Sequence, residues 1–177
     1  TPAQPYTNTA KNGAAQNSKL TTPTQISSGT TLSGAANTDS IGTDFAVGNT
    51  ITVNGSQTIT FVAAGTDTTG NPNEIAIDDT IGSLLAKIDT LSGNTTNPSS
   101  VSNGIVTLNT GLANNLSLVS SNTGAFASLG FSTASFTVTR GGGGTAGTGT
   151  VIGSDVKNFL DESVSGGCVE GAAAATC

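Results

Sequence analysis

The residues most able to do acid–base chemistry are a carboxylate pair, Asp78-Asp79. Two neighbouring carboxylates could act in general acid/base catalysis or bind calcium. They stand immediately before an apolar segment with helical spacing, however, where adjacent side chains point in different directions. Helix N-termini favour carboxylates both as caps and as partners of the helix dipole. We therefore expect Asp78 and Asp79 to cap a helix and not to form a site.

A second group of possible calcium ligands lies in the loop just before this pair. Its oxygen-bearing side chains are Asp67, Asn71, Asn73 and Glu74. The loop lacks the regularly spaced carboxylates and the glycine at the required step of an EF-hand. We expect a solvated turn, and no metal site.

Other catalytic chemistry finds little support. The chain has no histidine, so its many serines lack the usual base. The glycine-rich residues 147–153 have the wrong spacing for a dinucleotide fingerprint, and no Lys-Ser/Thr pair marks a phosphate loop. A glycosidase needs only two carboxylates, but one Tyr, no Trp and five basic residues leave little to bind a sugar. We expect no enzyme, no cofactor and no small-molecule substrate.

The two cysteines, Cys168 and Cys177, both lie near the C-terminal end of the chain. A disulfide between them would close a short loop and fit an oxidising location. Two free thiols in a tail without predicted order are the other possibility, and both interpretations remain open. Two cysteines without histidine fall short of a structural zinc set.

Composition excludes several partners. The 177 residues carry a net charge of −6 with only 5 basic residues, which disfavours binding to nucleic acid or to an anionic membrane. No apolar run approaches the roughly 18 residues that a membrane span needs. Charged residues make up 9%, and the abundant Thr, Ser, Asn and Gly are typical of secreted and cell-surface β-rich proteins.

The strongest local pattern covers residues 44–91. Polar and apolar side chains alternate over residues 49–53 and 56–62, on either side of Asn54-Gly55. Asn-Gly accepts the positive φ angles of a type I′ turn, so this pattern predicts a β-hairpin. A third strand is predicted at residues 74–77.

A helix is predicted directly after this strand. Its apolar residues recur at spacings of three and four, which places them on one face. Gly93 stands where a C-terminal cap is expected. The residues of the predicted face are Ile81, Leu84, Leu85, Ile88 and Leu91.

The rest of the chain predicts further short elements. A second hairpin is expected from strands at 105–108 and 116–119, followed by a short helix at 124–129 and a closing strand at 131–140. The fold class is therefore α+β, with β-rich hairpins and one or two packed amphipathic helices. The predicted layout is an extended arm or linker at 1–40, the β-rich α+β domain at 41–139, a glycine-rich linker at 140–153, an amphipathic helix at 154–165, and a flexible tail at 166–177.

Three segments together resemble the "hook IN" motif of bacterial flagellins and flagellar hook proteins. They are residues 47–55 (VGNTITVNG), 59–62 (ITFV) and 79–89 (DTIGSLLAKID), with Ile88-Asp89 where Ile-Asn is typical. Residues 102–130 resemble the hairpin and short helix that follow the motif. Residues 145–167 look most like alphaproteobacterial hook proteins, whereas the tail with Cys168 departs from that pattern.

This resemblance implies a structural protein without catalytic activity. In the family, such a module is inserted between terminal helices that build an inner tube, and these are not seen here. We therefore expect a fragment, the surface-exposed variable domain of a flagellar hook or filament subunit that serves motility. The implied partners are other copies of the subunit in a helical assembly, and the implied location is extracellular, on the flagellum or cell surface. The alternative is an extracellular adhesin or surface-layer binding module.

Overall fold

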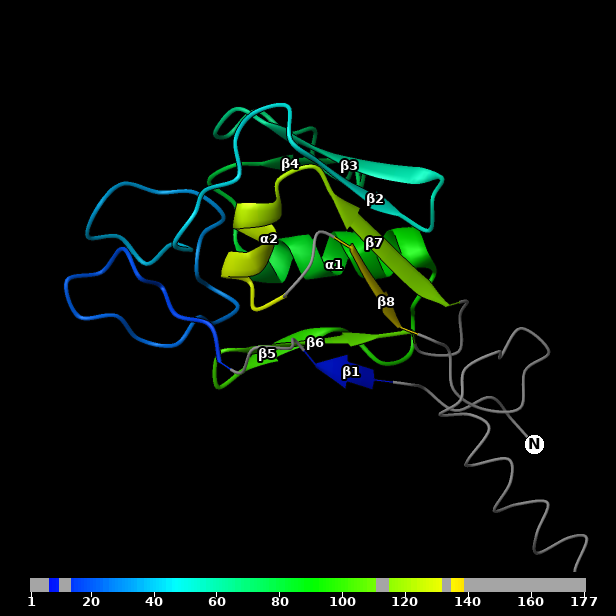
Figure 1. Cartoon of the computed structure of the whole chain (residues 1–177). Coiled ribbons are helices and arrows are strands. Elements are labelled where there is room, and N and C mark those ends of the chain that lie inside the picture. The colour runs from blue at the N-terminus through cyan, green and yellow to red at the C-terminus, as the bar shows by residue number, and fades with distance from the viewer. Residues whose placement is uncertain (1–6, 10–13, 111–114, 132–134, 139–177) are drawn as a thin grey trace, which may run out of the picture.

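Two β-sheets with a long helix between them form the described part of the chain (Figure 1). The computed structural model describes residues 7–9, 14–110, 115–131 and 135–138. Mixed sheets together with packed helices confirm the predicted α+β class. No helix among these residues is long and apolar enough to cross a membrane.

The larger sheet has five strands, and its centre is the predicted hairpin. β2 (Thr50–Val53) pairs antiparallel with β3 (Gln57–Val62) around Asn54 and Gly55, whose φ angles are 53° and 70°. Both values are positive, as a type I′ turn requires, so the predicted turn is confirmed. The sheet order is β4 (Glu74–Ala76), β3, β2, β7 (Leu116–Ser120) and β8 (Ser135–Val138), with β4 parallel to β3 and the other pairs antiparallel.

The smaller sheet corrects the prediction of a second hairpin. β6 (Ile105–Asn109) and β7 were expected to pair with each other, but they lie in different sheets. β6 pairs instead with β5 (Ser100–Ser102) and with β1 (Thr7–Thr9). The turn between β5 and β6 is a second Asn-Gly pair, Asn103-Gly104, with φ angles of 50° and 76°.

The helix α1 (Ile81–Ser92) lies between the two sheets (Figure 1). Its predicted apolar face is buried except for Leu91, which is half-buried. The predicted C-cap is confirmed, because Gly93 has a φ of 80° and donates to the Asp89 and Thr90 carbonyls. The predicted N-cap is wrong. Thr80 occupies that position, and its side-chain oxygen accepts a hydrogen bond from Ser83 N at 3.2 Å.

The short helix α2 (Thr123–Ser128) agrees with the prediction of a helix at 124–129 to within a residue at each end. Asn122 caps it by accepting a hydrogen bond from Ala125 N at 3.0 Å. Phe126 stacks on Phe131 with ring centroids 4.5 Å apart, which fastens the helix to the core. Of the closing strand predicted at 131–140, the described residues show β8 (Ser135–Val138), and Phe131 lies outside any strand.

The packed part of the chain begins before residue 41. Residues 14–40, predicted as part of an extended arm or linker, form no helix or strand, but isolated bridges occur at Gln25 and Thr31. Ile26 and Leu32 are buried in the same core as the sheets and α1. The carbonyls of Thr30 and Ser28 accept hydrogen bonds from the first two N–H groups of α1, each at 2.9 Å. This segment is therefore part of the folded domain.

The remaining predicted segments cannot be compared with the structure. The glycine-rich linker at 140–153, the amphipathic helix at 154–165 and the tail at 166–177 lie outside the described residues. The same holds for Cys168 and Cys177, so both interpretations of the cysteines stay predictions.

Candidate functional site

The carboxylates Asp78 and Asp79 lie in the turn between β4 and α1 and serve different contacts. Asp78 is exposed, and its Oδ1 accepts a hydrogen bond from Gly65 N at 2.9 Å. Asp79 acts through its backbone, accepting from Leu32 N at 2.8 Å. Among the described residues, no group of three or more His, Cys, Asp or Glu side chains is placed to hold a metal ion.

The loop between β3 and β4 brings its predicted oxygen ligands together but uses them internally. The Glu74 carboxylate accepts hydrogen bonds from Asn71 Nδ2 at 2.6 Å and from Thr68 N at 3.4 Å. Asn73 Nδ2 donates to the Thr58 carbonyl at 2.8 Å. Because these groups bind one another, they shape the loop and keep it against the edge of the sheet.

Lys87 of α1 joins this loop to the helix, a role that sequence reasoning missed. Its Nζ donates to the Asn71 carbonyl at 3.0 Å and lies 3.7 Å from Asp67 Oδ2. The partners are 16 residues away or more, so no local spacing indicates the contact. The partial burial of the Lys87 side chain makes this pair stronger than a freely solvated one, though still modest.

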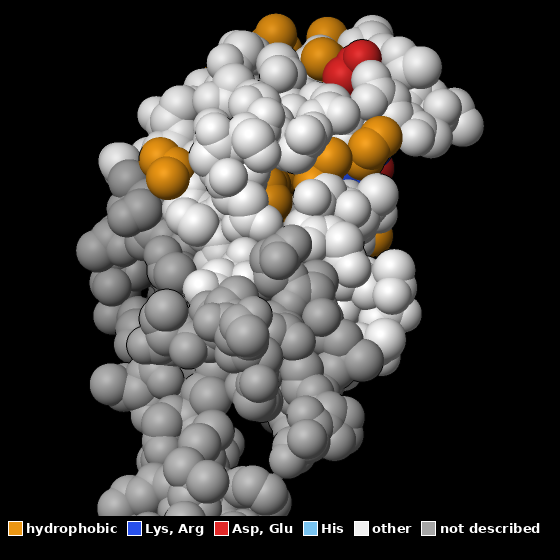
Figure 2. Space-filling model, turned by 90° about the vertical axis from the view of Figure 1, so that its right-hand side faces the viewer, with side chains coloured by type: hydrophobic (Ala, Val, Ile, Leu, Met, Phe, Trp, Pro, Cys, Tyr) orange, Lys and Arg blue, Asp and Glu red, His pale blue; other side chains and the backbone are white. Residues whose placement is uncertain are grey.

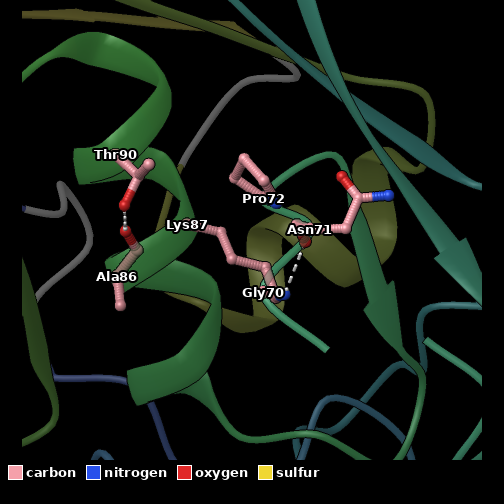
Figure 3. Close-up of a pocket in the computed structure, with 6 residues that line it drawn as sticks. All are labelled: Gly70, Asn71, Pro72, Ala86, Lys87 and Thr90. Atoms are coloured by element: carbon pink, nitrogen blue, oxygen red, sulfur yellow. Dashed lines mark hydrogen bonds between the residues drawn. The ribbon is translucent and has the colours of Figure 1, made fainter. Parts of the chain in front are cut away.

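A depression of about 200 Å³ lies between α1 and this loop (Figure 3). Figure 3 shows the Lys87 side chain reaching from the helix to the loop, where its ammonium group meets the Asn71 carbonyl. The lining contains no carboxylate, so it offers no acid–base pair to a substrate. The lining residues are Gly70, Asn71, Pro72, Ala86, Lys87 and Thr90.

A buried polar cluster lies near the C-terminal end of α1, around Asp89. This carboxylate is only 7% exposed, and it accepts hydrogen bonds from Ser99 N and Ser99 Oγ, both at 2.7 Å. Asn94 Nδ2 donates to it at 3.1 Å and also to the Asn109 carbonyl at 3.1 Å. The cluster fastens the loop that leads from α1 to β5. Its buried carboxylate is satisfied by these donors, so the cluster serves structure and leaves no free acid for chemistry.

The five-stranded sheet also has an outer face, which we define as the side of β2, β3 and β7 turned away from the core. These three strands contain no charged residue. Register pairs Thr50 with Thr60, and Thr52 with both Thr58 and Val119. Val119 is 48% exposed there. The outer face is thus a regular, uncharged surface of hydroxyl and methyl groups.

Low charge extends to other parts of the surface. Figure 2 shows a side of the molecule on which the described atoms belong mostly to uncharged polar side chains and backbone, with small, separate apolar groups and few charges.

No family model, no curated protein and no solved structure matches this chain. Function is therefore inferred from the motif order and surfaces of the chain itself.

Proposed function

We propose that the chain is the surface-exposed variable domain of a bacterial flagellar hook or filament subunit, a structural part without catalytic activity. The observation that carries this proposal is the order of elements in the motif. A hairpin with an Asn-Gly turn leads through one strand into the apolar-faced helix α1, which carries Ile88-Asp89 near its C-terminal end. The short helix α2 follows, as the resemblance implies, but the hairpin before it joins β5 and β6 and does not include β7.

The contacts of Asp89 support the motif where the sequence departs from it. The typical residue at this position is asparagine, and the Asp89 carboxylate fastens the loop after α1 by accepting hydrogen bonds from Ser99. An asparagine oxygen could accept from Ser99 N, but its NH₂ group could not accept from Ser99 Oγ or Asn94 Nδ2, as the second oxygen of Asp89 does. Asp89 therefore keeps the acceptor for Ser99 N that an asparagine would supply near the C-terminal end of α1, and adds a second one.

The outer face supports a role in contacts between subunits. Uncharged threonine and serine hydroxyls can donate and accept hydrogen bonds without the desolvation cost of charges. Such a face can pack against another copy of the subunit in a helical assembly and still shift as the assembly bends. The many local turns also suit a subunit that folds after export, because local contacts form fast.

Immunogold labelling tests this function without altering the protein. Antibodies raised against the purified chain are applied to intact cells that produce it, and gold is located by electron microscopy. Gold along hooks or filaments is the expected result. Gold spread over the cell body, with bare flagella, would overturn the proposal in favour of an adhesin or surface-layer module.

The full-length product gives a second test. Terminal helices with heptad patterns on both sides of this domain, and tubes or filaments formed by the purified product, are expected. A full-length sequence with tandem repeats of this domain and no such helices would contradict the proposal.

A further inference from the structure

The chain contains three Asn-Gly pairs, and two of them lie in described turns: Asn54-Gly55 and Asn103-Gly104. The third, Asn12-Gly13, lies outside the described residues. Glycine lacks a Cβ, so its backbone nitrogen is open to approach by the preceding side-chain amide. Such a pair can therefore undergo deamidation, and its surroundings decide how readily.

The reaction needs only water. The glycine nitrogen, after losing its proton, attacks Cγ of the asparagine, forms a C–N bond and expels the side-chain nitrogen as ammonia. Water then opens the resulting five-membered succinimide at either carbonyl. The products are aspartate or isoaspartate, each with one new carboxylate in place of the amide.

Asn54 is held away from this reaction. Its Oδ1 accepts a hydrogen bond from Ser117 N, and its own N–H donates to the Ser117 carbonyl, both at 2.8 Å. These bonds tie the turn to β7, which is paired along β2 in the middle of the five-stranded sheet. The bond to Oδ1 must break before Cγ can rotate toward Gly55 N, and the backbone bond restrains the turn itself.

Asn103 is placed differently. Its side chain is exposed and makes no hydrogen bond to any described residue. It follows β5, an edge strand whose Ser100 and Ser102 are exposed. Gly104, in contrast, is buried, and its carbonyl accepts a hydrogen bond from Ala15 N at 2.9 Å. The Asn103 side chain thus has no hydrogen bond with a described residue to break before its Cγ approaches Gly104 N, whereas Asn54 Oδ1 is held by Ser117 N.

We propose that Asn103 is a site of spontaneous deamidation in the folded protein and that Asn54 is protected. An isoaspartate at Asn103 inserts a backbone methylene directly before Gly104. Gly104 has no room to shift, because a Cβ there would lie 2.8 Å from the Ala15 carbonyl oxygen and 2.9 Å from the Ala14 Cβ. The modified turn therefore loosens the attachment of residues 14–26 to the small sheet.

Peptide mass mapping of the intact chain tests the proposal. The folded protein is incubated at mildly alkaline pH, and isoaspartate is quantified with an isoaspartyl methyltransferase. Because the Ser117 N bond to Asn54 Oδ1 must break first, deamidation at Asn54 should be slow, and the Asn103 peptide should convert about tenfold faster. A parallel sample in urea should convert both peptides at nearly the same rate.

The controls decide between structure and sequence as the cause. Asn103→Gln should abolish the signal from this peptide, because the ring that it would form is larger and closes slowly. Amide hydrogen exchange at Ala15 and Ile26 should speed up in the aged wild-type protein and not in the aged variant. Equal rates at both sites in the folded chain, or an unchanged ratio in urea, would overturn the proposal.

Discussion

Gly55 and Gly104 hold the same position in two Asn-Gly turns and share nearly the same backbone conformation, with φ angles of 70° and 76°. Their surroundings differ. A Cβ at residue 55 would meet nothing within 4 Å, whereas one at residue 104 would meet the Ala15 backbone oxygen at 2.8 Å. A backbone atom cannot swing aside as a flexible side chain can. The close approach of residues 14 and 15 therefore depends on Gly104.

The pair gives a matched stability test. Gly55→Ala should lower the free energy of unfolding by about 1–2 kcal/mol, the cost of a left-handed alanine. Gly104→Ala should lower the free energy of unfolding by that amount and about 1–3 kcal/mol more, because residues 14 and 15 must move away from the new Cβ. Urea unfolding followed by circular dichroism measures both. Equal losses in the two variants would contradict the close approach at Gly104.

Asp89 offers a second test on single residues, since its buried carboxylate accepts from Ser99 N, Ser99 Oγ and Asn94 Nδ2. Asp89→Asn keeps one acceptor oxygen but places an NH₂ group, itself a donor, next to donor groups that the carboxylate now accepts from. We expect a loss of about 1–3 kcal/mol in unfolding free energy. Asp78→Asn is the control, because an exposed amide oxygen can still accept from Gly65 N. A control that loses as much as Asp89→Asn would refute this account.

At the scale of elements, the N-terminus of α1 shows how the fold supplies acceptors for a helix. Ile81 N and Gly82 N donate to the carbonyls of Thr30 and Ser28 in the N-terminal segment. Ser83 N donates to the Thr80 side chain. The first N–H groups of a helix have no acceptor inside the helix, so these acceptors from outside it satisfy their hydrogen bonds.

Thr80 and Asp79 are both residue types that cap helices, and mutation separates them. Thr80→Ala should cost about 1 kcal/mol, because Ser83 N loses its acceptor. Asp79→Ala should change stability by less than about 0.5 kcal/mol, because the contacts of Asp79 go through its backbone. Thermal unfolding of both variants measures the difference. If Asp79→Ala lowered stability more than Thr80→Ala, the Asp79 carboxylate would be the functional cap.

Local rules explain which elements the sequence could predict. The Asn54-Gly55 turn and the apolar face around Leu84 depend on neighbours a few residues away, so pattern alone indicates them. The pairing of β6 depends on β5 and on the distant β1, and short alternating strands accept many partners. The predicted cap is wrong because Asp79 and Thr80 are both capping residue types that stand side by side, so the local pattern does not select between them.

The same reasoning applies to the candidate site. Loop residues such as Asn71 and Glu74 were found together because they are close in sequence. The contacts of Lys87 and Asp89 could not be predicted, because their partners are distant in sequence. Asn71 is 16 residues from Lys87, and Ser99 is 10 residues from Asp89. The outer face could be expected in part, since alternation in β2 and β3 places their threonines on one side.

At the scale of the whole molecule, residues 14–40 close one end of the fold. They contribute Ile26 and Leu32 to the core, and Lys19 forms an ion pair with Asp44. Just beyond them, Phe45 stacks on Phe61 of β3 with ring centroids 4.1 Å apart. These contacts link an irregular segment to the helix and the sheet, so the segment should unfold together with them.

Leu32→Ala tests whether the molecule is one cooperative unit. The Leu32 side chain is fully buried, so its truncation should cost about 2–5 kcal/mol and move the single urea transition to lower concentration. The matched Leu20→Ala, at a half-buried position of the same segment outside the core cluster, should cost less than about 1 kcal/mol. Amide exchange at Ile81 and Gly82, whose acceptors lie in the segment, should accelerate in step with the global loss. If the segment opened on its own, Leu32→Ala would speed exchange at these two amides while the main transition stayed in place, and that result would separate the segment from the domain.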